Sequence, residues 1–242
     1  GMIYFSTGNP GPDYNGAVRA GDNLFTVSIV ALDAYTGEYR WHFQEVHHDI
    51  WDYDAPNPVV LFDLDYNGVP RKGLAQAGKT GFLYILDRRN GEPLVGIEER
   101  PVPQEPRQAT AATQPYPIGE PFVVQTLDVA PEGYRLINNG AIFTPFWDEP
   151  VLLRRGDANW PPSTVDPEKG VMYVCAGERQ AAYFVRENLR PAKSGDRYTG
   201  GGMRFAPIPI TGIVSAMDLR TNRRLWSQRW PSRCYSGLVA TA

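Results

Sequence analysis

The sequence predicts an all-β protein, and three observations favour a β-propeller. Its 242 residues include 24 glycines and 22 prolines, nearly one residue in five, where about one in eight is typical. Aromatic residues make up 12% of the chain, and large aromatics with frequent turns favour short strands over helices. A segment that ends in tryptophan recurs along the chain, which is typical of radial all-β folds built from repeated units. A β-sandwich stays open as the alternative.

The recurring segment reads A-x-D-x-x-T-G-x-x-x-W over residues 31–41 and again over 216–226, with asparagine in place of the glycine. A degenerate third copy begins at residue 85 and has Val95 where the tryptophan stood. In each copy the aspartate caps a tight turn, and glycine or asparagine supplies the positive φ that the turn needs. We therefore expect a strand, a turn and a returning strand at each copy, with the tryptophans packed between neighbouring units.

Short β-runs that begin at a glycine accompany these copies, over residues 1–5, 81–85 and 170–174. The copies that begin at residues 31 and 85 lie 54 residues apart, which suits one four-stranded blade with a long loop. Residues 97–140 break this rhythm because they contain seven prolines, too many for a central strand or a helix. We expect this stretch to be an excursion over one face of a single partial propeller domain that spans residues 1–242.

Charge and hydropathy exclude several functional classes. The formal net charge is −3 with 21% charged residues, so neither a nucleic-acid reader nor a disordered acidic tail is expected. No apolar run approaches ~18 residues, so no membrane-spanning helix is expected. The sequence begins as a strand already under way and ends without a polar stop, so we expect it to be part of a longer protein. Cys175 and Cys234 form no C-x-x-C pair, which excludes such a redox or zinc motif but leaves two thiols and one disulfide both open.

All three histidines lie in one polar segment that follows the first tryptophan of the repeat. The segment contains, in order, His42, His47, His48, Asp49, Asp52 and Asp54. We expect it to form a loop at the end of a blade. Imidazole and carboxylate groups suit zinc, but the spacing of His42, His47 and Asp49 fits no standard zinc pattern. A loop of hydrogen-bonded polar side chains is the simpler interpretation, and spacing alone leaves both open.

Four segments together resemble one enzyme family. They read S-T-G-N-P-G-P over residues 6–12, H-H-D-I-W-D-Y-D over 47–54, G-K-T-G-F-L-Y-I-L-D-R over 78–88 and A-N-W-P-P over 158–162. In this order they resemble the pyrroloquinoline-quinone (PQQ) dehydrogenases, the quinoprotein alcohol and sugar dehydrogenases, whose fold is an eight-bladed propeller. The tryptophan-ended repeat is similar to the tryptophan-docking motif that joins neighbouring blades in that family. The resemblance implies an incomplete propeller, about half of an eight-bladed ring.

The resemblance implies a metal site and a general base in this chain. Asn9 and Asp52 match ligands of the metal ion beside the quinone, and Asp52 also matches the general base. Asp54 occupies the position of an extra ligand in lanthanide-dependent members, although sugar-oxidising members carry aspartate there too. A carboxylate beside a cation is a suitable base for an alcohol proton, and oxygen donors suit a hard ion such as Ca²⁺. The implied metal is Ca²⁺, with a lanthanide as the alternative.

The resemblance also implies contacts to PQQ. Lys79 matches the cation that hydrogen-bonds the reactive quinone oxygens, where it would stabilise the charge that develops during the reaction. Asn159 and Trp160 match positions at the rim of PQQ. Each of these residues also has a structural alternative, since asparagine and aspartate form turns, lysine is usually solvated and tryptophan packs between blades.

The resemblance thus implies a periplasmic PQQ-dependent oxidoreductase that oxidises an alcohol or an aldose by proton removal and hydride transfer, with ubiquinone or cytochrome c as electron acceptor. In that family a second metal carboxylate, an aromatic stacked on the quinone and a disulfide of adjacent cysteines lie upstream of the Asn9 motif. We therefore expect this chain alone to be inactive. The alternatives are a non-catalytic propeller scaffold of the bacterial envelope and a decayed homologue that binds nothing. Convergence of Asn9, Asp52 and Lys79 at one end of the propeller axis would distinguish the enzyme from the scaffold.

Overall fold

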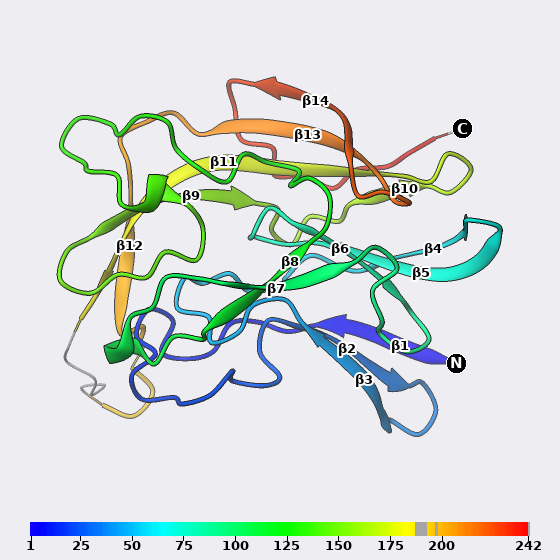
Figure 1. Ribbon diagram of the computed structural model, residues 1–242, viewed down its shortest axis with the longest axis horizontal. Coiled ribbons are helices and arrows are strands. Elements are labelled where there is room, and N and C mark those ends of the chain that lie inside the picture. The colour runs from blue at the N-terminus through cyan, green and yellow to red at the C-terminus, as the bar shows by residue number, and fades with distance from the viewer. Residues whose placement is uncertain (187–192, 197, 242) are drawn as a thin grey trace.

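Three antiparallel sheets of three or more strands follow one another along the chain in the computed structural model, with a two-stranded ribbon between the second and the third (Figure 1). The structure describes residues 1–186, 193–196 and 198–241, so the last residue of the predicted domain lies outside it. The first sheet has the strand order β1-β2-β3 and the second the order β4-β5-β6. Their bounds are β1 (Met2–Ser6), β2 (Ser28–Asp33), β3 (Tyr39–Gln44), β4 (Val60–Tyr66), β5 (Val69–Ala77) and β6 (Leu83–Asp87). Among the described residues, no helix combines the length and hydropathy needed to cross a membrane.

The third sheet is larger because one long strand pairs with different partners along its length. Its main path is β10-β11-β13-β14, while β9 and β12 pair with the second half of β11. The bounds are β9 (Val151–Asp157), β10 (Thr164–Asp166), β11 (Val171–Val185), β12 (Gly201–Phe205), β13 (Thr211–Asp218) and β14 (Arg224–Trp230). The main path is the four-stranded unit expected of a blade, whereas the two earlier sheets have three strands each. The all-β prediction is confirmed, and no sheet in the described part of the chain closes on itself.

The predicted strand–turn–strand units are present at two copies of the repeat. Asp33 accepts hydrogen bonds from the backbone N–H groups of Tyr35 and Thr36 at 2.9 and 3.1 Å, which closes the turn between β2 and β3. Asp218 makes the equivalent bonds between β13 and β14, where Asn222 takes a φ of 54°. The copy that begins in β6 differs, because its returning strand is reduced to an isolated bridge between Leu86 and Pro93. Proline has no backbone N–H to donate to a neighbouring strand.

The tryptophan of the first copy joins two sheets. Trp41 is 7% exposed, and its indole N–H donates to the Arg88 carbonyl beyond β6 at 3.3 Å. Its ring packs so closely on Gly91 that an added Cβ there would lie 2.6 Å from Cε3 of Trp41. Trp226 is 49% exposed, and its ring lies beside Tyr173 of its own sheet at 5.9 Å. The contact between units predicted from the repeat is therefore present at Trp41, and at Trp226 it stays a prediction.

Apolar layers fill the spaces between successive sheets. The layer between the first two sheets contains Ile29, Ala31, Trp41, Leu74 and Leu86. The layer between the second and third sheets includes Phe62, Ala75, Leu83, Met172, Val174 and Ile213. Each sheet thus packs face to face on the next, which is how blades of a propeller pack around a shared axis.

The proline-rich excursion has more structure than its composition predicts. It contains a two-stranded ribbon of β7 (Ile97–Pro101) and β8 (Thr113–Pro117) and two short 3₁₀ helices, η1 (Pro106–Gln108) and η2 (Asn138–Gly140). A two-stranded ribbon tolerates proline because its outer edges need no N–H donors. The excursion packs on the apolar cluster around Trp51 and Tyr53 through Val102, Tyr116 and Ile137, so it covers part of that cluster.

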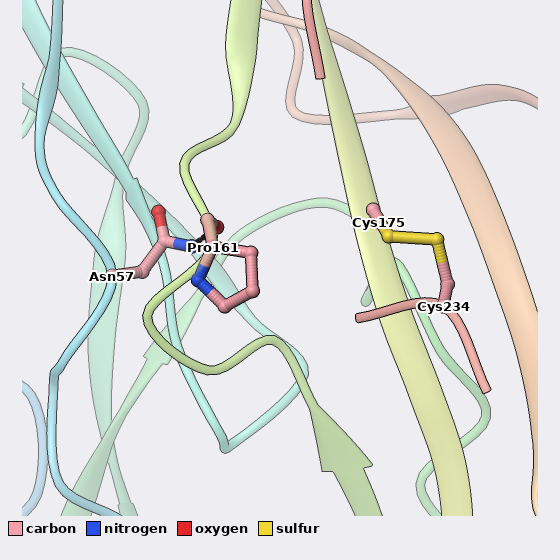
Figure 2. The surroundings of a disulfide bond; sticks show 4 residues. All are labelled: Asn57, Pro161, Cys175 and Cys234. Atoms are coloured by element: carbon pink, nitrogen blue, oxygen red, sulfur yellow. Dashed lines mark hydrogen bonds between the residues drawn. A yellow bond between two sulfur atoms is a disulfide. The ribbon is translucent and has the colours of Figure 1, made fainter. Parts of the chain in front are cut away.

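A disulfide joins Cys175 of β11 to Cys234 in the C-terminal segment, with their Cα atoms 5.6 Å apart (Figure 2). This settles the alternative that the sequence left open. The bridge spans 59 residues, and a cross-link of that length typically stabilises a fold by about 2–4 kcal/mol. Beside it, the Asn57 side chain donates to the carbonyls of Asn159 and Pro161 at 2.8 and 2.7 Å. The loop after β9 is thus tied to the loop before β4.

Candidate active site

The loop that carries Asp52 is shaped by a buried aspartate. The carboxylate of Asp49 accepts from the backbone N–H groups of Trp51 and Tyr53, both at 2.8 Å. These two bonds bracket Asp52, which takes a φ of 60°, a left-handed conformation that aspartate adopts more readily than most residues. Burial raises the pKa of Asp49 to about 7, although the two N–H bonds favour the ionised form. Asp49 therefore organises the loop by fixing the backbone on either side of Asp52.

The turn that carries Lys79 depends on glycine. The Gly81 N–H donates to the Gly78 carbonyl at 3.1 Å, so Lys79 occupies a central position of a tight turn between β5 and β6. Gly81 has a φ of 79°, and an added Cβ there would lie 2.5 Å from Val123. A larger residue would therefore displace the turn. Lys79 is only 5% exposed, so this turn directs its ammonium group inward.

Lys79 and the two aspartates form one cluster of charges. The Lys79 Nζ atom lies 3.3 Å from both carboxylate oxygens of Asp52 and 3.2 Å from its carbonyl oxygen. It also forms an ion pair with Asp54 Oδ1. Each aspartate side chain is 19% exposed, so the carboxylates have limited access to solvent. Burial raises the pKa of Asp54, an effect that the Lys79 charge opposes.

A second cation, absent from the sequence prediction, completes the cluster. Arg155 of β9 donates from Nη2 to Asp52 Oδ2 and to the Asp52 carbonyl, both at 3.0 Å. Its side chain is 3% exposed. Val151, Leu153 and Arg155 alternate along β9, and the first two belong to the buried apolar cluster. An arginine in line with a buried strand face implies an acidic partner, and this pattern was the available signal.

The other predicted site residues form hydrogen bonds outside this cluster. The Asn9 side-chain N–H donates to the adjacent Pro10 carbonyl at 3.3 Å. Trp160 is 65% exposed and donates its indole N–H to Tyr235. Asn159 is linked to the Asp52 loop indirectly, through the Asn57 side chain. Of the three residues expected to converge, Asp52 and Lys79 meet, and the convergence of Asn9 with them stays a prediction.

The histidines take part in other interactions. His42 pairs with the Tyr39 hydroxyl at 2.7 Å, and His47 lies between Gln44 and Glu99. The two ring nitrogens of His48 each lie 2.7 Å from a carbonyl, those of Gly21 and Gln108. Within the described residues, no group of three or more histidine, cysteine, aspartate or glutamate side chains is placed to hold a metal ion. The zinc alternative has no support among these residues. Asp52 and Asp54 are the two carboxylates brought together at Lys79.

A buried glutamate lies behind the Lys79 turn. Glu45 is 1% exposed, and neither carboxyl oxygen has a hydrogen-bond partner among the described residues. An added Cβ at Gly78 would lie 2.9 Å from Glu45 Oε2, so the carboxyl group packs directly against the turn. Burial raises the pKa of Glu45 well above its usual value, because a charge without partners is costly in an apolar site.

We expect Glu45→Gln to stabilise the protein at neutral and higher pH. The folded state holds the Glu45 proton more tightly than the unfolded state, whose pKa is near 4.5. Wild-type stability should thus fall as pH rises above that value, by up to about 1.4 kcal/mol per pH unit relative to the variant. Chemical denaturation between pH 4.5 and 8 tests this, with the exposed Glu98→Gln as control. A stability difference that does not grow with pH would contradict the prediction.

Comparisons with known proteins find similar proteins along most of this chain. The sequence profile described as the glucose/ethanol/alcohol dehydrogenase β-propeller domain (PQQ) matches residues 1–187. The quinoprotein alcohol dehydrogenase PedH of Pseudomonas putida is 28% identical over 242 residues, which cover 99% of this chain and 38% of that protein. The quinoprotein glucose dehydrogenase of Escherichia coli is also 28% identical, over 94% of this chain and 34% of its own length.

A solved structure of a similar protein has the same fold over nearly all of this chain. The quinohemoprotein alcohol dehydrogenase from Comamonas testosteroni superposes with a TM-score of 0.68 at 26% identity, over 98% of this chain and 34% of that one. The described sheets therefore follow the architecture of a propeller dehydrogenase. The chain spans about a third of the length of each of these three relatives.

Proposed function

The chain belongs to the PQQ glucose/ethanol/alcohol dehydrogenase family of β-propellers, and from this premise we propose that it forms part of a PQQ-dependent oxidoreductase. The substrate class would be an alcohol or an aldose oxidised at a CH–OH group. The observation that carries the proposal is the buried ammonium group of Lys79, held between Asp52 and Asp54. A scaffold has no need for such a cluster, since burying charges costs folding free energy.

The donor set agrees with a hard cation. Asp52 and Asp54 both contact one ammonium group, so they are close enough to share a cation of another kind. Carboxylate and amide oxygens are the ligands that Ca²⁺ prefers, and a lanthanide is the alternative. Asn9 would complete the set by turning its amide away from the Pro10 carbonyl. The tether from Asn57 to the Asn159 carbonyl supports a place for Asn159 and Trp160 at the rim of the same site.

Each residue of the cluster would have a different role in the reaction. Bound PQQ would supply the acceptor for the hydride, with the cation beside it as Lewis acid. Asp52 would take the hydroxyl proton from the substrate, because its carboxylate is partly exposed and held in one position. Lys79 would move from the carboxylates toward the acceptor oxygens, where its charge stabilises the negative charge that forms.

We further propose an oxidising compartment, the periplasm, for this protein. The Cys175–Cys234 bridge supports it, because structural disulfides persist where thiols are not kept reduced. Electrons would leave the site to ubiquinone or to a cytochrome c, since a two-electron oxidation needs a reoxidation step.

The direct test uses the complete protein that contains this chain. We would remove bound cofactor and metal, add PQQ with Ca²⁺ or La³⁺, and follow dye reduction with a panel of alcohols and aldoses. We expect turnover that depends on both PQQ and the metal. The isolated 242-residue chain is the control and should be inactive, because it spans about a third of the length of its relatives. No dye reduction by the complete protein with any substrate would refute the proposed function.

A further inference from the structure

Arg155 holds the Asp52 loop through two backbone carbonyls and one carboxylate oxygen. One nitrogen, Nη2, donates to Asp52 Oδ2 and to the Asp52 carbonyl, both at 3.0 Å. The other, Nη1, donates to the Trp51 carbonyl at 3.1 Å and to the Tyr183 hydroxyl at 2.7 Å. A planar guanidinium can make these bonds at once because its donors are fixed in a fork. The left-handed backbone of Asp52 is thus held by a group from a different sheet.

The same contacts make the two oxygens of the Asp52 carboxylate unequal. Lys79 Nζ lies 3.3 Å from each oxygen, so it favours neither. Only Oδ2 also accepts from Arg155 in the described part of the chain. A charge-assisted bond of this length withdraws electron density from Oδ2 and fixes its direction. Among the residues that the structure describes, Oδ1 has only the longer contact to Lys79, at 3.3 Å.

We propose that Arg155 is a positioning residue for the oxidation, and that it fixes the Asp52 carboxylate so that Oδ1 takes the substrate proton. This inference rests on the function proposed above and adds one residue to it. Because Arg155 also neutralises Asp52, it competes with any metal ion for that carboxylate. Removing Arg155 should therefore have opposite effects on turnover and on cation affinity.

The neighbouring arginine provides a matched control. Arg154 lies next to Arg155 in β9, but it pairs with Glu178 at 2.6 Å and lines a pocket of about 140 Å³ away from Asp52. Its side chain is 16% exposed, and Glu178 is 2% exposed. Arg154→Met thus removes a partly buried ion pair from the same strand without touching the Asp52 loop. Any effect common to both variants reports on folding.

The first measurement is turnover by the complete protein loaded with PQQ and metal. We expect Arg155→Met to lower kcat by about 100-fold with little change in KM, since a small misplacement of a reacting group has effects of this size. Arg154→Met should keep kcat within about twofold of wild type. Arg155→Lys should recover only part of the loss, because an ammonium group cannot make the forked contacts.

The second measurement is cation binding by the PQQ-free protein, followed by terbium emission sensitised through Trp51 and Tyr53. We expect Arg155→Met to bind Tb³⁺ about tenfold more tightly than wild type, because a competing positive charge is gone. A purely structural role for Arg155 predicts the reverse, with weaker binding and lower turnover together. A second variant, Tyr183→Phe, provides the test if Arg155→Met does not fold. It removes one hydrogen-bond acceptor of Arg155 and leaves every charge in place. We expect it to lower kcat by about three- to tenfold.

The outcomes separate the two proposals. If the wild type is active but Arg155→Met has an unchanged kcat or binds Tb³⁺ more weakly, the role proposed for Arg155 is wrong. The proposed function is not affected by that result. If Arg155→Met does not fold, an unchanged kcat in Tyr183→Phe would overturn the role of Arg155. A wild type that binds neither PQQ nor Tb³⁺ and oxidises no substrate would instead overturn the proposed function.

Discussion

Replacing Asp52 by asparagine in the complete protein is expected to lower kcat by about 10³-fold, within the range typical of a lost general base. The substitution keeps the size and most hydrogen-bonding geometry of the side chain, but the amide cannot accept the substrate proton. It also leaves the side chains of Lys79 and Arg155, which are 6% and 3% exposed, without the carboxylate that lies 3.3 and 3.0 Å from their nitrogen atoms. We therefore expect lower stability as well as lower activity.

Two controls separate the loss of a base from the loss of folding. Asp63→Asn makes the same chemical change at a carboxylate that is 66% exposed and paired with Arg88, and it should leave kcat unchanged. PQQ affinity, measured by quenching of tryptophan fluorescence, reports whether the Asp52→Asn site still forms. If the variant binds PQQ normally and turns over at a wild-type rate, Asp52 is not the base.

Local chemistry explains why the sequence predicted the repeating units correctly. The Asp33 carboxylate accepts hydrogen bonds from the N–H groups two and three residues ahead, and Gly37, four residues ahead, has a φ of 72°. Both features of the turn depend only on residues within the eleven-residue repeat, so the sequence pattern is enough to identify the turn. The third copy of the repeat, which lacks a full returning strand, also has a local explanation. Pro93 has no N–H to donate in that strand.

The site was less predictable because it is made of long-range contacts. Asp52 meets Arg155 only because β9 pairs with β11 in one register, which sets Arg155 opposite Arg179. No local pattern specifies that register. Glu45 gave no signal either, since an isolated glutamate is normally solvated, and its burial depends on the packing of the Lys79 turn against it. Trp160, expected at the cofactor rim, is 65% exposed, and its role stays a prediction.

Removing the Lys79 charge is the second substitution with a large expected effect. In Lys79→Met the carboxylates of Asp52 and Asp54 lose the ammonium group that they share, and two close carboxylates then repel each other. We expect kcat/KM to fall by about 10²–10³-fold, the effect of losing one group that stabilises developing charge. The exposed Lys72→Met, on the same β5–β6 hairpin, is the control and should be unaffected.

The same variant makes a prediction about metal ions that distinguishes a charge role from a packing role. Without the ammonium group, a divalent or trivalent cation is the remaining way to neutralise Asp52 and Asp54 together. Added Ca²⁺ or La³⁺ should therefore raise the melting temperature of Lys79→Met by more than that of wild type, because binding to the folded state stabilises it. If neither ion stabilises the variant more than wild type, the two aspartates do not act together as a cation site, and the metal ligands proposed here are wrong.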